Sequence, residues 1–181
     1  MRVITGTARG KKLETLKGND VRPTTDMVKE AVFSIIQFQI PGRRFLDMFS
    51  GSGQMGIEAL SRGAKEAYFL DMSRDAISVI KKNLEATGLS DRGKVANVDS
   101  LSFVKTTGEK FDVVFLDPPY GKGICEKALE VLPRVMNRGG VIICETEISE
   151  TLPETSGDFA LDRTYRYGKI KITTYRLPEE E

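Results

Sequence analysis

Short apolar runs alternate with helical patterns over most of this 181-residue chain, from Arg44 onward. The runs are typical of buried strands, and in the segments between them apolar side chains recur every three or four positions, as in an amphipathic helix. Strands alternating with helices predict an α/β fold with a mainly parallel sheet and right-handed crossovers. The expected strands are 45–49, 67–70, 95–98, 111–116 and 141–145, and the expected helices are 57–62, 75–87, 100–105 and 124–136.

The C-terminal part departs from this alternation. Residues 159–166 and 169–177 each alternate between apolar and polar positions, and they meet at Tyr167 and Gly168. This pattern predicts an antiparallel hairpin added to the parallel sheet. The expected sheet therefore has seven strands.

The N-terminal part has a pattern of its own. Residues 3–16 alternate and contain two glycines at the expected turn, which predicts a β-hairpin or two short strands. A helix is predicted to start in 22–26, where a proline, two hydroxyl side chains and an acid precede apolar residues at helical spacing, and to end at Pro41. We therefore expect a small extension over 1–22 and one larger domain over 23–181.

The composition is that of a globular protein, with 40% hydrophobic and 29% charged residues. No apolar run approaches the ~20 residues of a membrane-spanning helix. Residues 1–6 also lack the apolar block of a signal peptide. We therefore expect a cytoplasmic protein with no membrane partner, and nothing in the pattern requires an oligomer rather than a monomer.

The chain has no histidine and two cysteines, Cys125 and Cys144. Two thiols alone cannot form a zinc site, so no metal centre is expected. The absence of histidine excludes Ser-His-Asp and Cys-His catalysis. Acid–base work is left to carboxylates, lysines, tyrosines or backbone groups.

Charge is distributed unevenly along the sequence. Residues 1–45 contain nine Lys and Arg against four Asp and Glu, whereas the remainder contains 18 against 22. A basic segment on a mildly acidic body predicts an anionic partner, and we favour a nucleic acid. The candidates for phosphate contacts are Arg9, Lys11, Lys12 and Arg22.

The first predicted strand of the alternating region leads into a glycine-rich loop, which is a candidate ligand site. Gly51 and Gly53 allow a sharp turn and a close approach of the backbone to a ligand. Asp47 directly precedes the loop, and Asp71, 20 residues after Gly51, can accept the hydroxyls of a ribose. Asp99 ends the third strand, where it can accept from an adenine amine, cap the next helix, or do both.

This spacing fits a dinucleotide-binding fingerprint, so an NAD-dependent oxidoreductase is one alternative. The chain has no room for a substrate domain, however, and no residue stands out for hydride chemistry. A carboxylate at Asp47 suits a cationic group better than a pyrophosphate. S-adenosylmethionine (SAM), which carries a sulfonium and an ammonium and no phosphate, fits the pattern better.

The fourth predicted strand ends in Asp117, Pro118, Pro119 and Tyr120. Proline has no N–H and a fixed φ, and Pro119 also holds Pro118 extended, so the last strand carbonyls have no sheet partner. The resulting rim combines a carboxylate, free carbonyl oxygens and an aromatic ring, which suits a flat ring with an exocyclic amine. A tight turn followed by a core tyrosine is the alternative interpretation.

Several of these motifs carry a family resemblance. The segment 45–53 resembles the SAM-binding motif of class I methyltransferases, and 117–120 resembles the Asn/Asp-Pro-Pro-Tyr/Phe motif of enzymes that methylate amino groups. More narrowly, the segments 6–13, 22–26 and 57–63 resemble the RsmD family. The resemblance covers nearly the whole chain.

The resemblance implies a Rossmann-like class I fold and SAM as methyl donor. The implied acceptor is N2 of one guanine in bacterial 16S ribosomal RNA (16S rRNA), either free or in the small subunit or an assembly intermediate. With the residue patterns it gives three sets of candidate residues: catalytic Asp117, Pro118 and Tyr120; cofactor-binding Asp47, Phe49, Gly51, Gly53, Asp71 and Asp99; and substrate-binding Arg9, Lys11, Lys12, Arg22, Thr24 and Pro119.

Other functions stay open at this point. An amino-methyltransferase acting on DNA adenine or on a protein glutamine would use the same rim, and only segment 22–26 and the basic N-terminus argue against it. The NAD-dependent oxidoreductase is the second alternative. A non-catalytic RNA-binding module is the third, and the full set of cofactor and rim residues argues against it.

Overall fold

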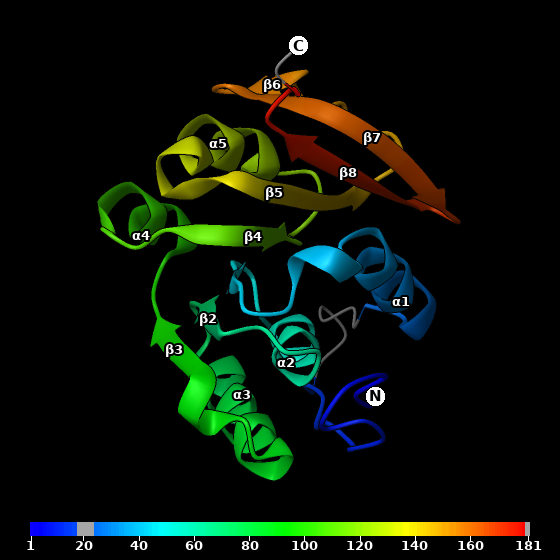
Figure 1. The fold of residues 1–181 in the computed structure, drawn as a ribbon, viewed down its shortest axis with the longest axis vertical. Coiled ribbons are helices and arrows are strands. Elements are labelled where there is room, and N and C mark those ends of the chain that lie inside the picture. The colour runs from blue at the N-terminus through cyan, green and yellow to red at the C-terminus, as the bar shows by residue number, and fades with distance from the viewer. Residues whose placement is uncertain (18–23, 180–181) are drawn as a thin grey trace.

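One eight-stranded sheet organises the computed structural model, which describes residues 1–17 and 24–179 (Figure 1). Five strands pair in parallel in the order β3-β2-β1-β4-β5, and β8, β7 and β6 continue the sheet antiparallel. The parallel strands are β1 (Arg44–Asp47), β2 (Glu66–Asp71), β3 (Gly93–Asn97), β4 (Phe111–Leu116) and β5 (Met136–Glu147). The others are β6 (Thr155–Ser156), β7 (Phe159–Tyr167) and β8 (Ile170–Arg176).

Helices cover both faces of the sheet (Figure 1). On one face, α1 (Asp26–Ile35), α2 (Gln54–Ser61) and α3 (Arg74–Thr87) contribute side chains to the larger hydrophobic cluster. On the other, α4 (Ser100–Thr106) and α5 (Ile124–Val131) contribute to a second cluster. Strand side chains alternate between the two clusters, as a sheet buried on both sides requires.

Most elements lie where the sequence predicts them, and β4 has the predicted bounds. The sheet has one strand more than the seven predicted, because the two-residue strand β6 pairs with the start of β7. The predicted helix 124–136 is also shorter. It ends as α5 at Val131 and continues as a 3₁₀ turn, Leu132–Val135, because Pro133 cannot donate a helical hydrogen bond.

The N-terminal segment forms a closed loop rather than a two-stranded hairpin. One antiparallel bridge joins Arg2 to Lys12, with the Val3 N–H donating to the Lys11 carbonyl at 2.9 Å. Val3 and Leu13 are buried in the same cluster as α1 and α2. The proposed division at residue 22 stays a prediction, because residues 18–23 lie outside the described ranges.

No helix within the described ranges is long and apolar enough to cross a membrane.

Candidate active site

The glycine-rich loop connects β1 to α2 at the carboxyl edge of the sheet, where open α/β folds bind ligands. Gly53 is the N-cap of α2 with φ +84°, a left-handed conformation that disfavours any other residue. Because the cap is a glycine, the cap residue itself offers no side-chain acceptor to the first helical N–H groups. The start of α2 therefore offers backbone donors at the loop.

Two of the predicted cofactor-binding acids flank this loop. Asp47 is 1% exposed, and its Oδ2 accepts from the Gly56 N–H at 3.3 Å. Asp71 bonds the loop from the next strand, with Oδ2 accepting from the Gly51 N–H at 3.0 Å and Oδ1 from the Ser73 N–H at 2.9 Å. Both acids thus hold the backbone that surrounds the candidate cofactor site.

The other two cofactor candidates have structural roles as well. Asp99 caps α4, where Oδ2 accepts from the Ser102 N–H at 3.0 Å and from the Ser102 hydroxyl at 2.8 Å. These two hydrogen bonds lower the pKa of Asp99. Phe49 is half-buried and packs against the second hydrophobic cluster.

The predicted rim follows β4, which lies beside β1 in the sheet. Asp117 and Tyr120 are half-buried, Pro118 is buried and Pro119 is exposed. The pairing of Asp47 with Phe115 puts the rim two residues beyond the end of β1. The glycine-rich loop and the rim therefore meet at one edge of the sheet, as the strand order of a doubly wound fold predicts.

Three carboxyl groups end adjacent strands on one face of the sheet. Asp47 ends β1, Asp117 follows β4, and Glu145 lies near the end of β5; each continues the alternation of strand residues whose side chains enter the α1–α3 cluster. Burial raises the pKa of Asp47 to about 7 and that of Glu145 to about 7. Burial, with the charges of Glu145 and Asp47, raises the pKa of Asp117 well above its usual value.

Glu145 is the member of this row that the sequence analysis did not single out. It is 2% exposed, and the Thr24 hydroxyl forms a hydrogen bond with it. The sequence contained a signal for it, because Glu145 follows Val141 and Ile143 at two-residue spacing and so faces the same core as these two residues of β5. An acid at such a position is either paired or functional.

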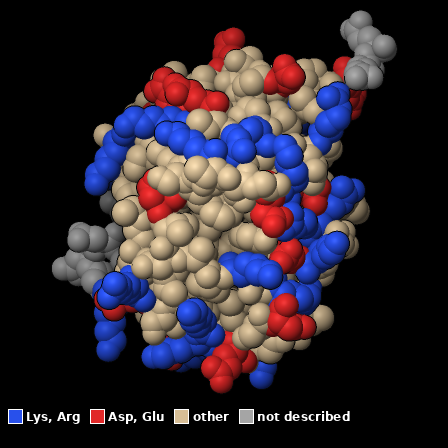
Figure 2. Space-filling model, turned by 90° about the vertical axis from the view of Figure 1, so that its left-hand side faces the viewer, with Lys and Arg blue, Asp and Glu red and all other residues tan. Residues whose placement is uncertain are grey.

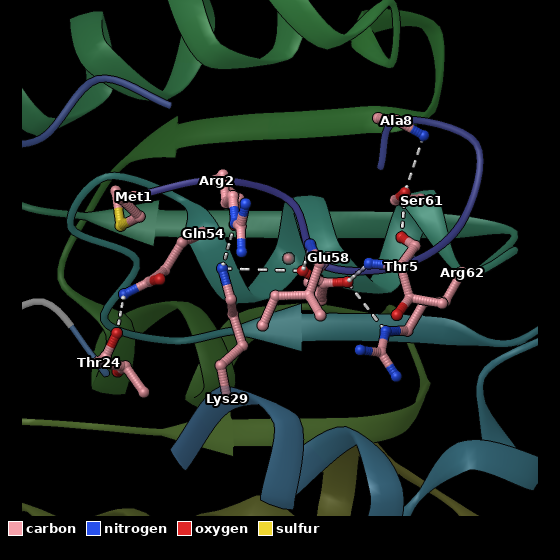
Figure 3. A network of polar contacts seen from close by, with 12 residues as sticks. Met1, Arg2, Thr5, Ala8, Thr24, Lys29, Gln54, Glu58, Ser61 and Arg62 are labelled. Atoms are coloured by element: carbon pink, nitrogen blue, oxygen red, sulfur yellow. Dashed lines mark hydrogen bonds and ion pairs between the residues drawn. The ribbon is translucent and has the colours of Figure 1, made fainter. Parts of the chain in front are cut away.

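The N-terminal loop is anchored along α2 by a buried polar network (Figure 3). Glu58, on α2, accepts from the Ile4 N–H at 2.8 Å and the Thr5 N–H at 3.0 Å, and forms ion pairs with Arg62 at 2.9 Å and Lys29 at 3.7 Å. Lys29 also donates to the Arg2 carbonyl at 2.8 Å. Its burial lowers the pKa of Lys29, and Glu58 opposes that shift.

Asn83 and Gln54 form hydrogen bonds that connect the N-terminal part of the chain to the glycine-rich loop. Asn83, 1% exposed, accepts from the Glu14 N–H at 2.8 Å and donates to the Ser52 carbonyl at 2.9 Å. Gln54 donates to the carbonyl of Thr24 at 3.2 Å. Thr24, predicted to bind substrate, is therefore buried between the loop and Glu145.

The predicted basic contact Arg9 lies away from the rim. Arg9, Lys11 and Lys12 are exposed, and Arg22 lies outside the described residues. The N–H of Ala8 bonds the Ser61 hydroxyl at the far end of α2, which is about 12 Å long at 1.5 Å per residue. Arg9, the next residue, thus lies at the end of α2 away from the glycine-rich loop, and an RNA touching it and the rim must span this length.

Basic side chains also gather elsewhere. Figure 2, which views the molecule from the side where α4 and β3 lie in Figure 1, shows a band of Lys and Arg across the upper part of that face. Acidic side chains interrupt the surface above and below it. The sequence asymmetry therefore does not by itself decide which face meets an anionic partner.

The family model described as "Conserved hypothetical protein 95" matches residues 1–176 of this chain. The chain belongs to this family. The "Ribosomal RNA small subunit methyltransferase D" of Escherichia coli is 34% identical, with 100% of this chain and 90% of the relative covered. The protein of the same name from Haemophilus influenzae is 39% identical over 84% of this chain and 81% of its own length. The resemblance to the RsmD family is thus confirmed.

Solved structures agree with the fold. The "Putative methyltransferase yhhF from Escherichia coli" superposes with a TM-score of 0.88 at 32% identity, covering 98% of this chain and 97% of its own. A Thermus thermophilus 16S rRNA N2 methyltransferase, RsmC, in complex with AdoMet and guanosine, has a TM-score of 0.72 at 20% identity, covering 88% of this chain and 44% of its own. At that identity the second comparison establishes the fold alone, which is the predicted Rossmann-like class I methyltransferase fold.

Proposed function

We propose that this protein transfers a methyl group from SAM to the exocyclic N2 of a guanine in 16S rRNA. The observation that carries the proposal is the meeting of two motifs at one sheet edge, the loop after Asp47 and the rim at Asp117, on adjacent strands β1 and β4. Membership of a family whose curated relatives are named small-subunit rRNA methyltransferases supports the acceptor class.

The residues at the glycine-rich loop fit SAM. Asp71 has the capacity to accept ribose hydroxyls, since each of its oxygens accepts one backbone N–H and keeps a second lone pair. Asp47 puts a carboxyl group beside the loop, which favours a ligand with ammonium and sulfonium charges over a pyrophosphate. When bound, SAM supplies an electrophilic methyl group on a sulfonium.

The rim residues act on the acceptor amine. The amine of guanine is a poor nucleophile because its lone pair is delocalised into the ring. In the proposed mechanism, the Asp117 carboxyl and the Pro118 carbonyl accept its two hydrogens and favour a pyramidal nitrogen, and Tyr120 and Pro119 hold the ring. Stacking of this kind contributes about 1–3 kcal/mol per base, and in-line positioning supplies much of the rate.

The proton released on methylation needs only a modest base. A methylated amino cation is acidic, and a carboxyl group with a raised pKa, such as Asp117, accepts its proton more readily than an exposed carboxylate. The absence of histidine is consistent with this chemistry. The guanine must leave its stack to reach the rim, which costs less from a loop or an RNA end than from a duplex.

The test is transfer of labelled methyl from SAM to unmethylated small ribosomal subunits, with naked 16S rRNA and DNA in parallel and mapping of the modified base. Label on N2 of one guanine is the expected result, and the comparison of particle with naked RNA identifies the form of the substrate. Label on DNA, or on no nucleic acid while SAM still binds, would overturn the proposed acceptor.

One comparison points to a different acceptor. A "Release factor glutamine methyltransferase" from Clostridium acetobutylicum is 39% identical over 101 residues, but these make up 55% of this chain and 35% of that protein. A partial match of this kind supports shared cofactor and rim motifs. A release-factor substrate added to the same assay distinguishes the two acceptors directly.

A further inference from the structure

The carboxyl group of Glu145 lacks the partners that a buried acid normally has. Its side chain is 2% exposed, and Oε2 accepts no hydrogen bond from any residue in the described ranges. A buried acceptor left unpaired costs about 1–3 kcal/mol. Glu58, at 0% exposure, shows the usual arrangement, with backbone and ionic donors on both oxygens. Glu145 therefore has capacity for a donor that none of the described residues supplies.

The position of Glu145 relates this capacity to the proposed acceptor rim. Leu116 on β4 pairs with Cys144 on β5, so the next residues, Asp117 and Glu145, lie side by side where the strands end. Both follow the residues that enter the α1–α3 cluster, and their side chains therefore leave the same face. The charge of Glu145 also contributes to the raised pKa of Asp117.

We propose that Glu145 is a specificity-determining residue that accepts a hydrogen bond from N1–H of the target guanine while Asp117 accepts from its N2 amine. Guanine carries these two donors next to each other on one edge, whereas adenine has an acceptor at N1. Two neighbouring carboxyl groups match the donor–donor edge and leave an unpaired acceptor against adenine. This inference rests on the proposed function and refines the recognition step of the same site.

Glu145 can reach the base by turning its terminal carboxyl group. The Thr24 hydroxyl bonds this group, and Oε2 is covered by its neighbours. The last torsion of a glutamate side chain is broad, so the carboxyl group can rotate about it without moving β5. When guanine binds, the unpaired oxygen of Glu145 gains a hydrogen bond from N1–H. When adenine binds, that oxygen stays unpaired.

The decisive experiment changes the hydrogen-bonding edge of the acceptor. The target guanine is replaced by 2,6-diaminopurine, which keeps the 2-amino group but has an acceptor at N1 and an amine in place of O6. The kcat/KM for methylation is measured with both RNAs, and the comparison of wild type with the Glu145 variant isolates the contact at N1. For the wild-type protein we expect at least about 10-fold preference for guanine, since a site left with an unpaired polar group rejects the analogue. In Glu145→Gln, whose amide can donate to N1, we expect guanine turnover to fall and the preference to shrink to about threefold or less.

Thr146→Val is the matched control. Thr146 is the next residue on β5, is 1% exposed, and also has a buried oxygen without a partner in the described residues, but it alternates to the other face of the sheet. Its substitution should leave the preference unchanged. An equal change of the preference in Thr146→Val would overturn the proposal, because a general disturbance of β5 would then explain both.

The remaining outcomes separate this inference from the proposed function. Wild-type methylation of guanine with an unchanged preference in Glu145→Gln overturns the role of Glu145 and leaves the function standing. No wild-type methylation of guanine overturns both. Should Glu145→Gln not fold, Glu145→Asp keeps the carboxyl group but withdraws it by one methylene. Guanine turnover is then expected to fall and the preference for guanine over diaminopurine to shrink, and an unchanged preference would overturn the inference.

Discussion

Two buried acids, Glu58 and Glu145, differ in how their charges are compensated. Glu58 lies on α2 and has four partners, two backbone N–H groups and two cationic side chains. Glu145 has the Thr24 hydroxyl and one oxygen without a partner among the described residues. The first arrangement holds the N-terminal loop in place. The second keeps a costly group beside the proposed acceptor site, which is typical of a residue retained for binding or catalysis.

The largest effect is expected at the rim. Asp117→Ala should lower methyl transfer by about 10²–10⁴-fold, the range for loss of a positioned acid–base group. It should leave SAM binding and the unfolding midpoint intact, because Asp117 carries a desolvation cost that alanine removes. Single-turnover methylation and calorimetric SAM titration check this, and near-normal turnover would show that Asp117 has no catalytic role.

A control for this prediction lies on the same strand. Asp112, at the other end of β4, accepts from the Arg44 N–H at 2.9 Å and from Asn137 at 3.0 Å. Asp112→Ala should lower stability and leave turnover per folded molecule unchanged. The pair distinguishes an acid that stabilises the sheet from one that serves the reaction.

The comparison between the two glutamates is tested directly by unfolding. Glu58→Ala should reduce the free energy of unfolding by about 3–5 kcal/mol, because it leaves the buried Lys29 charge without its partner. Glu145→Gln should change that free energy by less than about 1 kcal/mol or raise it, because it removes a buried group that is poorly compensated. Urea denaturation measures both. A larger loss at Glu145 than at Glu58 would reverse the assignment of structural and functional roles.

Stability should also depend on pH in an unusual direction. In the folded protein the pKa values of Asp47 and Glu145 are about 7, above the ordinary values of 3.8 and 4.5. Between about pH 4 and pH 7 the folded state therefore holds protons that the unfolded chain has released, and these two groups lower stability as the pH rises. We expect Asp47→Asn and Glu145→Gln to gain about 1–3 kcal/mol relative to wild type at pH 8 and much less at pH 4. Equal differences at both pH values would contradict the raised pKa values.

The smallest effect is expected at the exposed basic loop. Lys11→Ala/Lys12→Ala should weaken RNA binding severalfold and reduce the slope of log affinity against log salt by about 2, one unit for each phosphate contact. The matched control is Lys81→Ala/Lys82→Ala, which removes two adjacent exposed lysines from α3. Equal losses in both variants would indicate nonspecific attraction rather than contact by the N-terminal loop.

The sequence predicts the fold best where local signals agree. The α3 helix spans Arg74–Thr87 where 75–87 is predicted, and it ends at Gly88 in a left-handed conformation, a C-cap that the sequence marks. The start of α2 is less visible, because its cap is Gly53, which has no side chain to mark it. The strand β5 begins at Met136, before the predicted start at residue 141. The Gly139 and Gly140 pair resembles a turn in the sequence but lies within the strand.

The sequence predicts the motifs of the candidate site, but it does not predict which side chains contact one another. Asp47, Asp71 and Asp117 stand at strand ends that periodicity identifies. The contacts that distinguish Glu58 from Glu145 join positions far apart, such as Ile4 with Glu58, 54 residues away, and no local pattern encodes which acid finds such partners. The alternation of buried positions along β5 identifies Glu145 as an acid on a core-facing position. Only the register with β4 puts it beside Asp117.

The anchoring of the N-terminal loop has a consequence for biosynthesis. Glu14 meets its partner Asn83 across 69 positions, and a ribosome adding about 5–20 residues per second needs about 3–14 s to make that interval. Until then the cluster that Val3, Ala8 and Leu13 enter is incomplete, since α3 has not yet been fully made. These residues are therefore made before the helix that completes their cluster, and their apolar side chains stay incompletely covered until that helix forms.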